Sequence, residues 1–281
     1  MKGTIGIIHS DESKQGITHD FFASVIEGFR QECNENNYNI AFLNSIRDEK
    51  NKDTYLEQIK ENGYAGVLIA CSETNAEIEE LLSSDIIVGT VDKDYERVIN
   101  VSSDNTEGMK ALMEHIISNG HKKIAIITGD DNLVCNMRLG AYIKACEMHD
   151  IKIDDDYILR GHFRDIDKAY YLTEKLLKLP VAPTCIIYSD DYAAIGGINA
   201  IHSRGLEIPR HISVAGYDGN LIMSQLEPRL TTVYQDTGKM GRSVAKRMIE
   251  GIENPQNVSY STEIVATTLR EGHSVGRVYE F

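Results

Sequence analysis

The chain has 281 residues, of which 42% are hydrophobic, and carries a formal net charge of −14. This length and composition predict one large or two modest globular domains with a real core. The acidic balance, with a pI near 5.1, argues against a nucleic-acid surface in this chain, because phosphate binding relies on clustered Lys and Arg.

The five cysteines include no C-x-x-C pair, so the sequence predicts neither a disulfide framework nor a zinc site. Free thiols favour a reducing, cytoplasmic compartment. The N-terminal stretch "MKGTIGIIHS" has an apolar run too short for a signal peptide or a membrane span, so we expect no membrane association. No cofactor is indicated.

Apolar runs of strand length alternate with helical patterns along almost the whole chain. After the first run, Phe21, Phe22, Val25, Phe29 and Cys33 recur on one face, which predicts an amphipathic helix. Continuous apolar strands separated by helices of roughly 10 to 15 residues predict parallel sheets. The strands of this first set are predicted at residues 4–10, 38–44, 65–71 and 86–91, and the second set begins after the stretch "VINVSSDN" (98–105).

A second set repeats the alternation, so the fold class is α/β. Asp104 or Ser103 is predicted to cap its first helix, and Gly120 to end that helix as a C′ glycine. The predicted strands lie at residues 122–129, 157–163, 184–190 and 212–218.

The last elements are too few for a third domain and must complete the two sheets. They are a strand at 230–236, a helix from about 237 to 251 and a strand at 261–268. We therefore predict two parallel-sheet, Rossmann-like lobes joined by three crossovers, with a ligand cleft between them. The lobes comprise residues 1–102 plus 236–261, and 103–235 plus 262–281.

No enzyme motif is present: no G-x-S-x-G elbow, H-E-x-x-H pair, phosphate loop or G-x-G-x-x-G. The pairs Asp130-Asp131 and Asp190-Asp191 fit helix capping or ligand binding better than catalysis. The scattered histidines, including His115, His121 and His202, are interpreted as surface or capping residues, and no metal site is predicted.

Ligands of open parallel sheets bind beyond the carboxyl ends of the strands. Four successive predicted strands end there in polar or aromatic residues that a core would not require. These candidates for ligand binding are Asn132, Asn136, Arg138, Phe163, Asp190 and Asp218.

Two of these candidates have open alternatives. The Asp218 carboxylate, between flexible Gly216 and Gly219, can accept hydroxyl hydrogen bonds from a sugar, or can form an Asx turn with its own backbone. The fork of Arg138 can bind ligand oxygens, or can form a surface ion pair with Asp130 or Asp131.

An aromatic pair opens the first helix. Of Phe21 and Phe22, one is expected in the core, while the other could stack on a sugar ring or base.

Six ordered segments resemble the effector-binding core of the LacI/GalR family of bacterial transcription regulators, which shares its fold with periplasmic sugar-binding proteins (periplasmic binding protein-like I). The resemblance covers nearly the full chain. Its segments are "DFFASVIEGF" (20–29), "YLEQIKENGYAGVLIA" (55–70), "VSSDNTEGMKALMEHIISNGHKKIAIITG" (101–129), "RLGAYIKA" (138–145), "DDYAAIGGINAIHSRGLEIPRHISVAGYD" (190–218) and "LTTVYQDTGKMGRSVAKRMIE" (230–250).

The resemblance implies that Arg138 and Asp218 hold the effector, with Phe21 and Phe22 in the first lobe, and Phe163 and Asp190 in the second. Three departures stand out. The loop "HSDESKQGITH" (9–19) is longer than usual, Asp190 replaces a frequent asparagine, and the DNA-reading head is missing ahead of "IGII".

The first hypothesis is thus the ligand-sensing domain of a transcriptional regulator, expected to be a cytoplasmic homodimer and not an enzyme. Its partners are a small effector, expected to be a neutral sugar, and operator DNA bound through an N-terminal head absent from this chain. The alternative is a free-standing solute-binding protein that feeds a transporter, and an enzyme on this fold is a third possibility.

Overall fold

The computed structural model describes residues 1–9, 18–45, 52–70, 75–93 and 95–278. The chain divides into two compact units, and it passes from one to the other three times. Unit 1 consists of Met1–Ser103 and Asp236–Val265, and unit 2 of Asp104–Gln235 and Ala266–Phe281.

Unit 1 contains a six-stranded parallel sheet in the order β11-β5-β4-β3-β1-β2. Its inner strands β3 and β5 are buried throughout, whereas the edge strands β2 and β11 each have exposed residues. This difference follows from helices covering both faces at the centre of the sheet. The strands are β1 (Gly3–Ile8), β2 (Tyr38–Phe42), β3 (Gly66–Ile69), β4 (Ile87–Val91), β5 (Ile99–Ser103) and β11 (Thr262–Val265).

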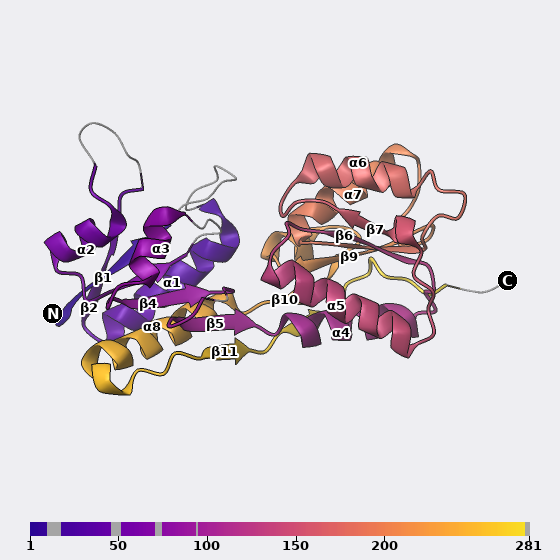
Figure 1. Ribbon diagram of the computed structural model, residues 1–281. Coiled ribbons are helices and arrows are strands. Elements are labelled where there is room, and N and C mark those ends of the chain that lie inside the picture. The colour runs from indigo at the N-terminus through magenta and orange to yellow at the C-terminus, as the bar shows by residue number, and fades with distance from the viewer. Residues whose placement is uncertain (10–17, 46–51, 71–74, 94, 279–281) are drawn as a thin grey trace. The chain divides into compact units, whose positions relative to one another are not determined.

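Two pairs of helices cover the sheet of unit 1. α1 (Asp20–Glu35) and α8 (Thr237–Glu253) share one core cluster with the strands, while α2 (Tyr55–Asn62) and α3 (Ala76–Leu82) share another. α1 and α8 pack backbone to backbone, because a Cβ at Gly28 or Gly241 would overlap the carbonyl of Gly238 or Val25 on the facing helix. Figure 1 shows α8, from late in the chain, beside the strands of the N-terminal segment.

Unit 2 repeats this plan in a six-stranded sheet of order β12-β10-β9-β8-β6-β7. All neighbours are parallel except the pair β10–β12. The strands are β6 (Ile124–Thr128), β7 (Ile158–Arg160), β8 (Cys185–Tyr188), β9 (Ser213–Asp218), β10 (Thr231–Tyr234) and β12 (Thr268–Arg270).

Helices again cover both faces of the sheet of unit 2 (Figure 1). α4 (Asn105–Ser118) and α5 (Leu133–Met148) lie on one face, and α6 (Ile166–Leu176) and α7 (Asp191–Ser203) on the other. Of the short 3-10 turns, η2 (Asp155–Tyr157) lies between α5 and β7, η3 (Leu221–Gln225) joins β9 to β10, and η4 (Pro255–Asn257) follows α8 in unit 1. The α/β fold class with two mostly parallel sheets is confirmed.

The predicted ends of α4 are confirmed. Asp104 caps α4 by accepting from the Glu107 N–H, and Gly120 has the left-handed backbone (φ +89°) of a C′ glycine. Two boundaries differ from the prediction. The first segment of unit 1 ends at Ser103 rather than at residue 102, and its second segment extends to Val265 rather than to residue 261, because β11 pairs with β5. Most of the long loop at residues 9–19 lies outside the described residues, and so does Cys71. In the part of the chain described here, no helix combines the length and apolar character of a membrane span.

Candidate functional site

The carboxyl edge of the sheet of unit 2 contains its topological switch point. From β6 the chain runs to β7 on one side and then to β8 on the other, and ligands of such sheets bind where this reversal occurs. A small cavity of about 10 Å³, roughly the room of one water molecule, lies at this edge. Its lining includes Thr128, Gly129, Arg138, Phe163 and Ser189.

Arg138 is the buried cation of this edge, with only 6% of its surface exposed. Its Nε donates to Asn105 Oδ1 at 2.8 Å, and one terminal nitrogen donates to the Ser189 carbonyl at 3.0 Å. The guanidinium lies over the Tyr217 ring, 3.5 Å from its centroid. Because a guanidinium has five N–H donors, these two bonds fix the fork and leave further donors for a ligand.

Asp218 ends β9 beside that cation, and its side chain is half-buried. Gln235 Nε2 donates to its Oδ1 at 2.7 Å. Burial raises the pKa of the Asp218 carboxyl well above its usual range, while the Arg138 charge acts in the opposite direction. The backbone of Asp218 is in the left-handed region (φ +104°), an uncommon conformation for a non-glycine residue that is often found at functional sites.

The two glycines near Asp218 have different roles. Gly219 turns the chain with φ +69°, as expected. Gly216 was expected to do the same, but that expectation is wrong, because Gly216 is an ordinary strand residue. It must be small because a Cβ there would collide with the carboxylate of Asp191.

The pair Asp190-Asp191 performs two structural tasks. Asp190 caps α7, because its Oδ1 accepts from the Ala193 N–H at 2.9 Å, and its Oδ2 accepts from the Arg164 N–H at 2.8 Å. Asp191 accepts from the Thr232 hydroxyl and from the Asn220 N–H, both at 2.6 Å. Burial raises the pKa of Asp191 to about 7. Because both oxygens of Asp190 already accept backbone hydrogen bonds, this carboxylate can bind a ligand only by sharing its oxygens with those donors.

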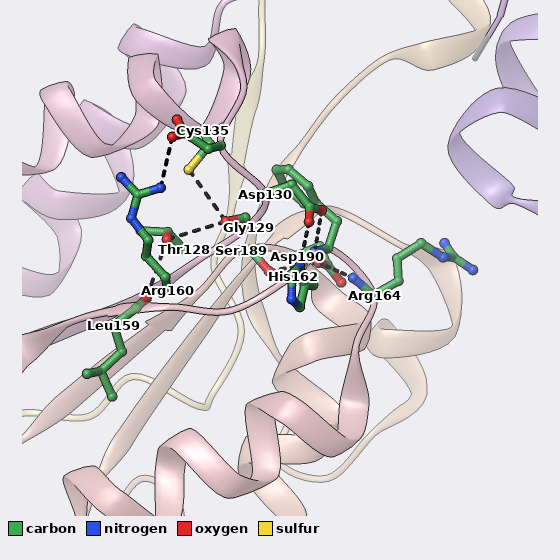
Figure 2. Close-up of polar contacts among 12 residues, drawn as sticks. Thr128, Gly129, Asp130, Cys135, Leu159, Arg160, His162, Arg164, Ser189 and Asp190 are labelled. Atoms are coloured by element: carbon green, nitrogen blue, oxygen red, sulfur yellow. Dashed lines mark hydrogen bonds and ion pairs between the residues drawn. The ribbon is translucent and has the colours of Figure 1, made fainter. Parts of the chain in front are cut away.

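The proposed ion pair between Arg138 and Asp130 or Asp131 is wrong. Asp130 pairs with His162, and Asp131 pairs with Arg160 at 3.0 Å. Figure 2 shows the contacts of Asp130 with His162 and of Asp190 with Arg164 at the ends of neighbouring strands.

Phe163 shares this edge with the cation. Asp130 Oδ2 accepts from the Phe163 N–H at 3.1 Å, which holds the residue in place. The Phe163 ring lies against Gly129 and 6.0 Å from the Arg138 guanidinium, as a wall of the cavity. Arg138, Phe163, Asp190 and Asp218 thus gather at one edge.

Asn132 and Asn136 are exposed and have other partners. Asn132 caps α5 by accepting from the Cys135 N–H at 2.9 Å, and Asn136 donates to Asp131 at 3.4 Å. Neither lines the cavity.

Phe21 and Phe22 lie in the first turn of α1 in unit 1. Both are half-buried and pack against the core, with their rings edge to face at a centroid distance of 5.3 Å. Which of the two rings could stack on a ligand therefore stays a prediction, because neither ring is fully buried.

The interpretation of His121 as a surface or capping residue is also wrong, since only 1% of it is exposed. Its Nε2 donates to the Gly276 carbonyl, and its Nδ1 accepts from the Thr184 hydroxyl. Burial lowers the pKa of His121. Among the described residues, no group of three or more His, Cys, Asp or Glu is arranged to hold a metal ion.

Sequence reasoning missed Asn105, Ser189, Tyr217 and Gln235 as parts of this site. Asn105 and Ser189 position Arg138, Tyr217 stacks on it, and Gln235 holds Asp218. Tyr217 and Gln235 each stand next to an acidic residue at a strand end, which is a usable signal. Nothing local marks Asn105, which is 33 residues away from Arg138.

Together, the two switch-point sheets and the polar carboxyl edge of unit 2 define a small-ligand-binding core. A family model for the periplasmic binding protein-like domain matches residues 113–275. The protein named Probable HTH-type transcriptional repressor ExuR, from Bacillus subtilis, is 31% identical over 90% of this chain and 75% of its own length. The HTH-type transcriptional repressor PurR of Vibrio parahaemolyticus is 26% identical over 85% of this chain and 73% of its own length.

Solved structures agree on the fold. The LacI family transcriptional regulator from Enterococcus faecium, with bound ribose, superposes with a TM-score of 0.83 at 23% identity, over 98% of this chain and 100% of that chain. The chain belongs to the LacI/GalR family of transcriptional regulators and represents its effector-binding core.

Proposed function

We propose that this chain is the sensor of a LacI-family repressor and that it binds a small, neutral, polar effector, most simply a sugar. Arg138, Asp218 and Phe163 make the main contacts at unit 2, and Asp190 contributes through its shared carboxylate. Phe21 and Phe22 add an apolar contact surface in unit 1.

One observation carries this proposal: a guanidinium and a carboxylate are held at the same sheet edge with bonding capacity left over. Asn105 and Ser189 orient Arg138, and Gln235 orients Asp218. Donors from Arg138 and acceptors from Asp218 suit a molecule that offers both, as a hydroxyl does. Such fixed polar groups beside an aromatic wall are typical of small-molecule sites.

The local charge favours a neutral effector. Asp190, Asp191 and Asp218 accompany a single buried cation, and the acidic neighbours help to raise the pKa of Asp218. A phosphate would add further negative charge to this edge. Two structural neighbours are described with bound ribose, and another as a cellobiose complex, which supports a sugar here.

Calorimetric titration with monosaccharides, sugar phosphates and nucleobases tests the ligand class. We expect the tightest binding from a neutral sugar, and at least a tenfold loss, about 1.4 kcal/mol, in Asp218→Asn. Asn keeps one acceptor oxygen and the backbone turn, so the variant tests the carboxylate itself. Tightest binding to a phosphate would refute the proposal.

Effector binding is proposed to control DNA binding. The effector shifts the protein between two arrangements, and a coupling free energy of roughly 1 to 3 kcal/mol is enough to change operator binding.

We propose a cytoplasmic homodimer. It binds operator DNA through residues outside this core, in line with the description of the relatives as HTH-type transcriptional repressors. The free, buried state of the four described cysteines fits that compartment. Sedimentation tests the dimer, and a monomer at micromolar concentration would contradict it.

A further inference from the structure

The carboxyl edge of the sheet of unit 1 has its own switch point, between β1 and β3. From β1 the chain runs to β2 on one side and then to β3 on the other. His9 follows β1 directly, and Ala70 follows β3, one step beyond the paired residues Ile8 and Ile69. His9 therefore stands where an open parallel sheet places its ligand.

The hydrogen bond of His9 fixes the role of each ring nitrogen. Nδ1 lies 2.6 Å from the Ala70 carbonyl oxygen, and because a carbonyl only accepts, Nδ1 carries the hydrogen. Nε2 of the neutral ring is then a bare acceptor. This atom is buried and has no hydrogen-bond partner among the residues that the structure describes. A buried acceptor without a partner has lost its hydrogen bonds to water, so native proteins rarely keep one without a use.

The His9 imidazole packs against an aromatic cluster at the start of α1 through the Phe22 ring. The Phe22 ring meets the imidazole edge to face, with centroids 5.7 Å apart, and Phe21 meets Phe22 in the same way. His19 packs on Phe22 at 4.9 Å. These contacts hold the imidazole in one orientation and supply an apolar surface suited to the C–H face of a sugar ring.

The same arrangement recurs at the switch point of unit 2. There Arg138 donates to the Ser189 carbonyl, which follows β8, just as His9 donates to the Ala70 carbonyl, which follows β3. In both units, one side-chain N–H donates to the backbone carbonyl that directly follows a strand at the switch point, β3 in unit 1 and β8 in unit 2. Arg138 retains donors after this bond, and His9 retains an acceptor, so the two are complementary in what they offer a ligand.

We propose that His9 is an effector-binding residue, whose Nε2 accepts a hydrogen bond from a sugar hydroxyl while Phe22 contacts the adjacent ring carbons. This assignment rests on the proposed function and adds to it a requirement. The effector must present a donor, not a carboxylate or phosphate oxygen, to unit 1.

Calorimetric titration of four forms tests the assignment, with the tightest binder from a panel of D-ribose, D-galactose, D-glucose and D-galacturonate as the probe. His9→Phe loses the acceptor and is expected to bind at least tenfold more weakly. His9→Gln can donate to Ala70 and still accept, so we expect it to stay within about threefold of the parent. His149→Phe, a matched change at the end of α5 far along the chain, should not alter binding.

A spectroscopic measurement on the unmutated protein does not depend on how the variants fold. The imidazole ¹⁵N spectrum should contain a resonance of an unprotonated nitrogen that is absent from the spectrum of His9→Phe. This resonance should move when the sugar saturates the protein. An unmoved resonance would overturn the assignment.

The outcomes separate the two proposals. If Arg138→Met weakens binding and His9→Phe does not, the His9 assignment is wrong while the proposed function stands. If His9→Gln binds as weakly as His9→Phe, the lone acceptor is not what matters, and the assignment also fails. A panel without any binder overturns both.

Discussion

The two units share the same sheet topology but differ in the side chains at the carboxyl ends of their strands. Unit 2 collects Arg138, Asp190, Asp191 and Asp218, each of which is oriented by hydrogen bonds within the protein. Unit 1 presents imidazole and phenyl rings, with one acceptor of His9 left over. A preorganised polar edge gives orientation and specificity, whereas an aromatic edge gives contact area at small desolvation cost. The same sheet plan thus ends in different chemistry in the two units.

The largest effect should come from removing the cation of the polar edge. Arg138→Met leaves Asp218 without its nearby positive charge and deprives Asn105 and the Ser189 carbonyl of their donor. We expect a loss of about 3 kcal/mol in the free energy of unfolding, measured in urea. Arg204→Met, which breaks an exposed pair with Glu174, is the control and should change little. Equal effects would mean that the polar edge is not preorganised as described.

The packing of unit 1 gives a second test, independent of its edge. Gly241→Ala places a Cβ against the Val25 carbonyl and forces α1 and α8 apart. Overpacking of this kind should cost about 2 kcal/mol. Gly140→Ala, in a helix position with open space around the new Cβ, should instead stabilise by about 0.5 kcal/mol. Differential scanning calorimetry should show the loss in the first variant only.

Asp190→Ala separates the structural role of this carboxylate from ligand binding. The loss of the α7 cap and of the bond from the Arg164 N–H should cost about 1 to 2 kcal/mol. Asp165→Ala removes only the cap of α6 and should cost about 1 kcal/mol. If the two variants are equally stable, the link from Asp190 to Arg164 contributes nothing to the edge.

The smallest effect concerns His121, which ties Gly276 and Thr184 together in unit 2. Because burial lowers its pKa, the unfolded chain binds the proton more readily, and stability should fall as the pH drops below the unfolded pKa of about 6.5. Between pH 7 and 6 this amounts to at most about 0.7 kcal/mol. His121→Gln should flatten the profile, measured by urea titration at each pH, and an unchanged profile would contradict the assignment.

Periodicity and capping residues were enough to predict the fold, because strands and helices alternate with clear hydrophobic patterns. They also placed Arg138, Phe163, Asp190 and Asp218 at one edge, since parallel strands end on the same side. What the sequence could not provide was the partner of each side chain. The bond from Arg138 to Asn105 and the burial of His121 depend on contacts between distant segments. His9 escaped notice because only its burial and its bond to Ala70 reveal the spare nitrogen.

The order in which the sheet of unit 1 is completed has a consequence for biosynthesis. β11 and α8, which close this sheet and cover one face, come from residues near the end of the chain. A nascent chain emerging from the ribosome exposes the apolar faces of α1 and β5 until almost every later residue has been translated. In unit 2, by contrast, every helix and strand except β12 lies in the single segment Asp104–Gln235. Unit 2 should therefore fold first, with chaperones shielding the unfinished first half during translation.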